Sequence, residues 1–420
     1  MDETLRQGDA ADPGAQGAGA GASAAPSPSA RAGQGGGPAA TPHGTPADAP
    51  APAPAPKRGI LTLSPLNRRR VQNFRANKRA LWSLRIFSIL FLVSLCAELV
   101  ANDRPILVSF QGAYLTPLTE SYAETRFGGD FETEASFTDP FVQCLIRTGG
   151  ATDACFDDDN AAVPEGNEAG WILWPLIPFS YDTVDYAVAT APSPPDATHL
   201  LGTDDRARDV LARVIYGFRL SVLFGFGVTL AASLIGIVAG AAQGFFGGWV
   251  DLTFQRVEEV WSSMNTLYVI LILSAIFAPS LWLMFFIFVA FSWTQLIGVV
   301  RAEFLRARNF EYVQAARALG VGDWTIMFRH VMPNAMVATV TLAPFLLTSS
   351  IGLLAGLDFL GFGLSEGYPS LGELALQGKK YLTDPHLAIT AFLTFAVMLS
   401  LMVFVFEGVR DAFDPRKAFA

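Results

Sequence analysis

The chain has 420 residues, of which 51% are hydrophobic and only 16% are charged, and its net charge is −9. A mean hydropathy of +0.36 excludes a water-soluble protein of this length, because a single core could not hide so much apolar surface. The negative net charge gives no support to nucleic-acid binding. Composition therefore predicts an integral membrane protein.

The N-terminal part of the chain consists of a tail and a basic segment. Residues 1–56 are mostly Ala, Pro, Gly and Ser, which cannot bury enough apolar surface to offset chain entropy. We expect a disordered cytoplasmic tail there, and not a signal peptide. Ser64 and Pro65 fit an N-cap and a first helical position. The basic residues around them predict a helix over 57–80 that lies on anionic lipid headgroups.

Six apolar stretches are long enough to cross the hydrocarbon core of a membrane, which takes about 20 helical residues. They cover residues 81–101, 220–246, 257–277, 281–300, 335–357 and 388–407. These stretches are much longer than the alternating segments of a transmembrane barrel, and open sheet edges are not tolerated in lipid. The predicted fold is an all-α membrane protein with six transmembrane helices.

Basic residues beside the spans predict the orientation, because Lys and Arg resist transfer across the membrane. Nine of them lie before or at the start of the first span: Lys57, Arg58, Arg68, Arg69, Arg70, Arg75, Lys78, Arg79 and Arg85. An even number of spans puts the C-terminus and the 301–334 loop on the same side, with Arg410, Arg416 and Lys417 and with Arg301, Arg306, Arg308, Arg317 and Arg329. Both termini and this loop are therefore predicted to be cytoplasmic, and residues 102–205 to be periplasmic.

The predicted periplasmic region contains two of the three cysteines. Cys144 and Cys155 are near enough in sequence to close a short ring, and a periplasmic location permits a disulfide. Two reduced thiols in a variable insertion are the other interpretation. Cys96 lies in the first span, as a small packing residue. The stretch 171–186 is too short and too polar for a span, and it predicts an interfacial belt or the core of a small cap.

Residues 199–221 predict an amphipathic helix that leads into the second span. Asp204 or Asp205 can cap this helix. Its apolar stripe consists of Val210, Leu211, Val214 and Ile215. The polar residues expected to face water are Arg206, Arg208, Asp209 and Arg213. The helix is either an ordinary interfacial helix or part of a gate.

Small and neutral polar residues inside the spans predict packing and path positions. Glycines recur at every fourth residue of the second span, on one face where another helix can approach closely: Gly236, Gly240, Gly244 and Gly248. This seam forms either within the bundle or against a second subunit. Neutral polar residues either bond a peptide along the path or pack helices together, and these are Asn265, Gln295, Thr348, Ser349 and Ser350. Pro344 is a candidate kink.

The loop between the fourth and fifth spans has the pattern of two short helices. Residues 311–319 favour a helix, and Gly320 breaks it. Asp323 can cap a second helix, which Pro333 ends where the fifth span begins. Ala315 and Ala316 are small enough to let the first helix seat in a groove of another protein. A simple connector between spans is the alternative.

This loop resembles the coupling loop of ABC-importer permeases, which carry EAA, three residues, Gly, nine residues, Ile, one residue and Leu-Pro. The positions that match this spacing are Gln314, Ala315, Ala316, Gly320, His330, Met332 and Pro333. Gln stands in place of Glu, while His and Met in place of Ile and Leu are similar to the peptide-importer branch. The stretches LGTDDRARDVLARVIYG from Leu201, GWVDLTFQRVEEV from Gly248 and LDFLGFGL from Leu357 also resemble dipeptide and oligopeptide permeases.

The resemblance is greatest to permeases of the microcin C and oligopeptide importers. It runs from about residue 60 to the end, and we expect the tail and the insertion with the two cysteines to lie outside it. It implies a second homologous permease, two cytoplasmic ATPase subunits and a periplasmic binding protein as partners. It also implies oligopeptides or peptide conjugates of the microcin C kind as the cargo.

The same resemblance implies which subunit has which role. ATP with Mg²⁺ is bound by the ATPase subunits, so no cofactor is expected in this chain, which is predicted to lie in the bacterial inner membrane. The residues expected at the ATPase contact are Glu311, Gln314, Ala315, Ala316, Arg317, Gly320, Asp323, His330 and Pro333.

Two other classes of protein fit the sequence less well. A secondary transporter driven by a proton or sodium gradient needs an ionisable site at the membrane midplane. The acidic residues of the predicted spans instead lie near span ends, at Glu98, Glu258, Glu259 and Glu407. A membrane enzyme needs convergent acids, bases or metal ligands. The histidines are not at ligand spacing, and no catalytic or metal site is predicted: His43, His199, His330 and His386.

Overall fold

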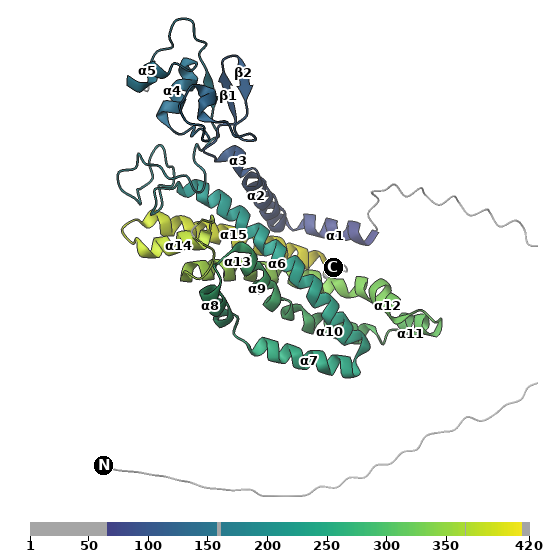
Figure 1. The fold of residues 1–420 in the computed structure, drawn as a ribbon. Helices are drawn as coiled ribbons and strands as arrows, with labels where there is room; N and C mark the ends of the chain where they lie inside the picture. The colour runs from purple at the N-terminus through teal and green to yellow at the C-terminus, as the bar shows by residue number, and fades with distance from the viewer. Residues whose placement is uncertain (1–64, 158–160, 366, 414–420) are drawn as a thin grey trace, which may run out of the picture. The chain divides into compact units, whose positions relative to one another are not determined.

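The computed structural model describes residues 65–157, 161–365 and 367–413, and the predicted tail at 1–56 lies outside them. Helices dominate the structure (Figure 1). They are α1 (Pro65–Ala76), α2 (Lys78–Leu95), α3 (Ala97–Val100), α4 (Pro140–Thr148), α5 (Thr152–Asp157), α6 (Val210–Phe246), α7 (Gly248–Ser263), α8 (Thr266–Ile276), α9 (Leu281–Ser292), α10 (Thr294–Ala307), α11 (Glu311–Ala318), α12 (Asp323–Thr325), α13 (Met332–Leu360), α14 (Leu371–Lys380) and α15 (Pro385–Phe413). A 3-10 helix η1 (Glu124–Phe127) and a π-helical turn η2 (Ile326–Val331) complete the helical part.

Four helical stretches of the described residues are long and apolar enough to cross a membrane: Val210–Phe246, Leu281–Ala307, Thr339–Leu360 and Pro385–Phe413. The pair formed by α7 and α8 adds a fifth candidate, bent by 67°. Helix α2, in the first predicted span, is not among them, because its 18 residues include Lys78, Arg79 and Arg85. The structure thus supports four or five of the six predicted spans by length and composition.

Three of the predicted spans are divided between two helices, which corrects the sequence analysis. Residues 281–300 are divided at Trp293 between α9 and α10, although the two helices together still form one candidate span of 27 residues. The helix over 81–101 breaks at Cys96, between α2 and the short α3. Residues 257–277 are divided between α7 and α8, because the Asn265 side chain accepts a hydrogen bond from Leu267 N at 3.0 Å and so caps a new helix. The second predicted span, in contrast, is continuous with the amphipathic segment before it, and α6 has 37 residues.

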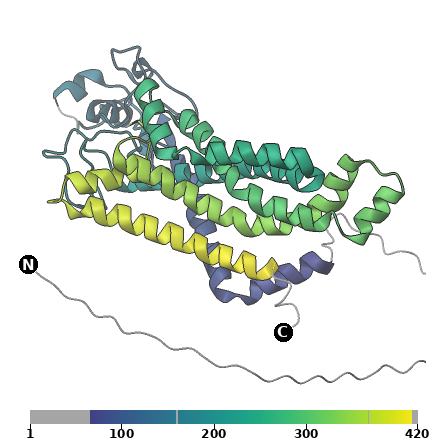
Figure 2. The ribbon, with the colours of Figure 1, turned by 90° about the horizontal axis from the view of Figure 1, so that it is seen from below.

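The basic segment at the N-terminal side forms α1, which is shorter than the predicted helix over 57–80. It ends at Ala76 because the Asn77 side chain accepts a hydrogen bond from Ala80 N at 3.2 Å and begins α2. Residues 57–64 lie outside the described part. Figure 2 shows α1 beside the C-terminal end of α15. There the Arg70 guanidinium lies 4.4 Å from the centre of the Phe413 ring.

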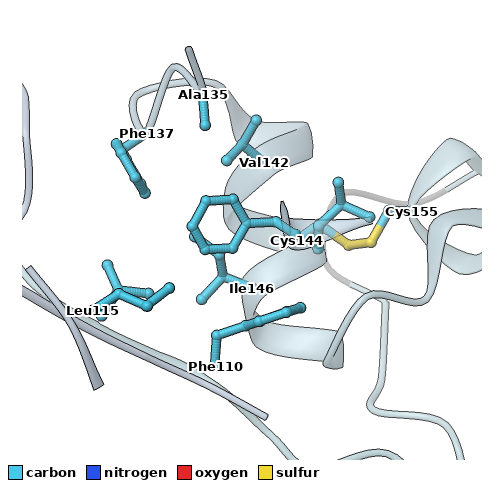
Figure 3. Close-up of a cluster of buried hydrophobic side chains, with 11 residues drawn as sticks. Phe110, Leu115, Ala135, Phe137, Val142, Cys144, Ile146 and Cys155 are labelled. Atoms are coloured by element: carbon cyan, nitrogen blue, oxygen red, sulfur yellow. A yellow bond between two sulfur atoms is a disulfide. The ribbon is translucent and has the colours of Figure 1, made fainter. Parts of the chain in front are cut away.

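Residues 107–173 form a small domain with a sheet, so the prediction of an all-α fold is wrong in this region. Strands β1 (Leu107–Phe110), β2 (Ala113–Leu115) and β3 (Trp171–Leu173) are antiparallel and lie in the order β2-β1-β3. One face of the sheet packs on α4 through buried side chains, and Cys144 and Cys155 form a disulfide there (Figure 3). Such a bridge suits a domain whose hydrophobic core is small.

The glycine row of α6 forms a close contact with α10 inside this chain. A Cβ atom on Gly236 would lie 2.7 Å from Trp293 O, and one on Gly244 would lie 2.5 Å from Arg301 O. On Gly240 it would lie 2.9 Å from the Val300 Cβ atom. The seam is therefore internal. Gly248 does not belong to it, because it begins α7 with a φ of +56° and its Cβ position is open.

We predict that Gly240→Leu lowers the stability of the protein by about 1–3 kcal/mol, since the new side chain must push α10 away from α6. The measurement is the thermal unfolding midpoint in detergent. Gly298→Leu is the matched control, because Gly298 lies on α10 with nothing within 4 Å of its Cβ position. Equal midpoints for the two variants would contradict the seam.

Candidate functional site

The loop between α10 and α13 bends at Gly320. This residue has a φ of +79°, which favours glycine, although its Cβ position is open. Gly320 N donates to Arg317 O at 2.9 Å, and Val321 N donates to Ala316 O at 3.1 Å. This pair of bonds is the Schellman motif, which ends α11 and turns the chain toward α12. The backbone, and not the space around it, therefore requires a glycine here.

One side of the loop is anchored to the ends of the long helices. Val313, Ile326 and Met327 are fully buried against Phe304 of α10 and Phe245 of α6. We call these five residues the anchor cluster. The chain then runs through the π-helical turn η2 directly into α13. Pro333 lies in the first turn of α13, so the prediction that it ends the second loop helix is wrong, and it sits where its missing N–H costs least.

The other side of the loop exposes large apolar side chains. Leu319 is 83% exposed and Trp324 is 61% exposed, and the Trp324 ring stacks on Phe328 with their centres 5.8 Å apart. Tyr312 and Phe310 are also exposed. Aromatic side chains that project together from a polar loop are typical of a protein contact. The sequence analysis missed Leu319, Trp324 and Phe328, although aromatic residues in so polar a loop were a usable signal.

The residues predicted at the ATPase contact divide between the two sides. Ala316 is half-buried against the anchor cluster, so of the two alanines only Ala315 is fully on the outer side. The Arg317 guanidinium lies 5.0 Å from the Phe245 ring centre and its Nε lies 3.4 Å from an Asp323 carboxylate oxygen. The remaining exposed positions are Glu311, Gln314, Gly320, Asp323, His330 and Pro333. The Gln314 amide donates to Asn309 O at 3.2 Å.

The five predicted path residues do not gather in one place among the described contacts. Asn265 serves as the cap of α8, and the hydroxyls of Thr348 and Ser349 donate to carbonyls of their own helix, at Pro344 and Leu346. Gln295 is exposed, whereas Ser350 is buried. A cavity of about 470 Å³ at the start of α6 and α9 is lined by aromatic side chains, among them Tyr181, Tyr216, Trp282 and Phe285, together with aliphatic side chains and Arg219.

At the other end of α6 the structure corrects the predicted helix start. Asp209, and not Asp204 or Asp205, is the N-cap, and its carboxylate accepts from Ala212 N at 2.7 Å. Three residues expected to face water, Arg208, Asp209 and Arg213, are 5% exposed or less, and Arg206 alone is exposed. Sequence periodicity failed for the two arginines because one of their partners, Glu373, comes from α14, more than 150 residues later in the chain.

Buried charges connect this segment to α14. The Asp204 carboxylate, which is 0% exposed, accepts hydrogen bonds from the Arg213 guanidinium and, at 2.7 Å, from Arg208 Nε. The other arm of Arg213 donates to Glu373 of α14 at 2.6 Å. Nearby, both ring nitrogens of buried His199 face carboxylates, at 2.9 Å from Asp209 and 3.2 Å from Asp185. The residues Asp204, Arg208, Arg213 and Glu373 are called the ionic cluster below.

We predict that Arg213→Leu destabilises the protein by about 3–5 kcal/mol, because removal of one member leaves the Asp204 and Glu373 carboxylates buried without it. Arg206→Leu is the control from the same loop, and its exposed side chain should contribute less than about 1 kcal/mol. Chemical unfolding of the purified protein, followed by tryptophan fluorescence, measures both. A similar loss of unfolding free energy in the two variants would show that the buried arginine contributes no more to stability than the exposed one.

The ionic cluster also predicts an acid dependence of stability. Burial raises the pKa of the Asp204 carboxyl, but the guanidinium groups of Arg213 and Arg208 and two backbone N–H groups outweigh it, and the pKa lies below the ordinary value of 3.8. A carboxylate with a lowered pKa stabilises the fold above pH 3.8, and this contribution disappears as the pH falls through the folded-state pKa. As the pH is lowered below 3.8, the thermal unfolding midpoint should therefore fall more steeply in the wild type than in Asp204→Asn. Parallel curves would contradict this assignment.

Comparison with known proteins shows the family to which the chain belongs. Residues 232–419 match the family of binding-protein-dependent transport system inner membrane components. The chain is 50% identical to the peptidoglycan transport system permease protein YejE of Agrobacterium fabrum, over 85% of this chain and 94% of that protein. It is also 50% identical to the inner membrane ABC transporter permease protein YejE of Escherichia coli, over 85% of this chain and 99% of that protein. Identity to the oligopeptide transport system permease protein OppC of Haemophilus influenzae is 32%, over 57% of this chain and 78% of that protein.

The described helices include four candidate spans, or five with the bent pair, as a multi-pass membrane protein requires. The chain belongs to the permease subunits of ABC importers that serve peptide transport, and it lies in the inner membrane. This confirms the resemblance to the peptide-importer permeases, among which the YejE proteins match most of the chain. One expectation is corrected. The match covers 85% of the chain. The residues outside 102–205 are fewer than this matched length, so the match must include part of 102–205.

Proposed function

We propose that this chain couples the work of ATPase subunits to a peptide path through its 311–333 loop. The exposed apolar side of the loop supports this proposal, because Leu319, Trp324 and Phe328 offer a contact surface that the described chain leaves open to the exterior. The anchor cluster is on the opposite side of the same loop. A push on the outer side is therefore passed to the ends of α6, α10 and α13.

In this proposal the loop, the start of α1 and the end of α15 face the cytoplasm, and the 107–173 domain faces the periplasm. Excess Lys and Arg next to the first and last helices supports that orientation. The chain works with a second permease, ATPase subunits that bind ATP with Mg²⁺, and a periplasmic binding protein. A disulfide in the outer domain is consistent with an oxidising compartment.

The proposed cargo is a short peptide or a peptide conjugate, with conjugates of the microcin C kind included. The names of the relatives refer to oligopeptides and to peptidoglycan, and peptide is the chemistry these two share. The cavity at the start of α6 and α9 suits such a cargo, since its aromatic rings offer apolar contact and Arg219 lies among them. A gradient-driven transporter would instead take up peptide without any ATPase.

Leu319→Asp tests the coupling contact most simply. It places a charge on the outer side of the loop, so we expect at least a tenfold loss of ATPase subunit copurified with the permease from detergent, because burying an unpaired carboxylate is costly. Leu382→Asp is the matched control. Leu382 is 82% exposed, close to the 83% of Leu319, but it lies in the turn between α14 and α15.

Retained copurification in Leu319→Asp, or equal loss in Leu382→Asp, would overturn the proposed contact. Uptake of labelled peptide by proteoliposomes gives the second measurement. Uptake that proceeds with a proton gradient and without ATP would favour the gradient-driven alternative.

A further inference from the structure

The sheet of the 107–173 domain has a second face, which is turned away from the core and carries three exposed large side chains. Side chains alternate along a strand, so Val108 and Phe110 point into the core while Leu107 and Ser109 point away from it. The register then fixes their neighbours. Ser109 pairs with Tyr114 on β2 and with Trp171 on β3, and Leu107 pairs with Leu173. We call Leu107, Ser109, Tyr114, Trp171 and Leu173 the outer sheet face.

This face presents large apolar side chains to the exterior. Tyr114 is 71% exposed, Trp171 is 45% exposed and Leu173 is 49% exposed. The Tyr114 and Trp171 rings come from strands on either side of β1, and their centres are 6.3 Å apart. Single exposed apolar residues are ordinary on a protein surface. Two aromatic rings and two leucines side by side, however, have the composition of the centre of a protein contact.

The support beneath this face is rigid. Its reverse side packs on a core that the disulfide between Cys144 and Cys155 closes (Figure 3). The chain that leads into β3 is also tightly held, because a Cβ atom on Gly170 would lie 2.2 Å from Ile146 O and 2.6 Å from Ser109 O. A surface that is already ordered loses little conformational freedom when it binds a partner.

Charge indicates what kind of partner fits. Residues 102–175 contain 13 Asp and Glu against only three Arg, a net charge of −10 in a chain whose total is −9. Such a domain is repelled by anionic lipid headgroups, which argues against the outer sheet face lying on the membrane. It attracts a protein with a basic surface, and it speeds the encounter from a distance.

We propose that the outer sheet face is a docking surface for the transporter's own substrate-binding protein, whose basic surface the acidic domain would attract. This inference rests on the proposed function, because only a binding-protein-dependent importer has such a partner. The acidic, disulfide-closed domain would then hold the loaded binding protein close to the entrance of the path.

The test uses the complete transporter in nanodiscs and its purified, fluorescently labelled binding protein. The dissociation constant is measured for the wild type and for the double variant Tyr114→Ser, Trp171→Ser. We expect at least a tenfold weaker affinity, with recovery in Tyr114→Phe, Trp171→Phe. Affinity of the wild type should also fall as salt is raised, because the attraction is partly electrostatic. Labelling of free thiols checks that the disulfide still forms in each variant.

Phe131→Ser is the matched control, since Phe131 is 64% exposed in the same domain but lies outside the sheet. Unchanged affinity in the double variant, equal loss in Phe131→Ser, or no binding to the wild type would overturn the docking surface. Copurification of the ATPase subunit is measured on the same samples. Intact ATPase copurification with failed docking refutes only this inference, whereas loss of the ATPase in the wild type refutes the proposed function.

Discussion

One packing contact fixes the loop to the helical bundle, and the rest of the structure depends on it. Val313, Ile326 and Met327 of the loop pack against Phe304 and Phe245 of the long helices. These side chains are excluded from water, and separating them would expose apolar surface at about 25 cal/mol per Å². The loop is consequently part of the helical bundle and not a flexible arm. In the proposed coupling, a motor subunit that contacts the outer side of the loop would therefore act on the helical bundle itself.

In the proposed coupling, two connections would carry a displacement of the loop into the membrane. The π-helical turn η2 joins it to α13 without a break, so the loop and that span share one backbone. The glycine seam joins α6 to α10, where backbone atoms come too close for a side chain. A closely packed seam without side chains slides poorly, and the two helices therefore respond together. At its far end α6 is held to α14 by the ionic cluster, so both ends of this long helix have partners.

Local features of the fold could be predicted from the sequence, whereas long-range ones could not. Gly320 could be identified because a left-handed bend is a property of a few consecutive residues. Helix periodicity gives the row of Gly236, Gly240 and Gly244, but it also includes Gly248 and does not show that the partner is α10 of the same chain. Arg208 and Arg213 were placed in water because an amphipathic pattern records which residues are polar and says nothing of Glu373 on a distant helix. Asp204 is likewise engaged in tertiary contacts, and the cap is Asp209 rather than Asp204 or Asp205. The candidate site was half predicted: its bend was found, but the aromatic side chains that make its outer surface were not.

Rigid attachment of the coupling loop to α10 is the central claim, and one distance measures it. Spin labels at Ala318→Cys on α11, a position outside the predicted ATPase contact, and at Arg306→Cys on α10, with Cys96→Ser to remove the free thiol, would be followed by pulsed EPR in the complete transporter. Both native side chains are exposed, so the labels should not disturb the anchor cluster. The distance distribution should be the same before ATP is added and during hydrolysis, because loop and helix move as one body. A distribution that changes with ATP would show that the loop moves on its own, and would contradict coupling through the anchor cluster.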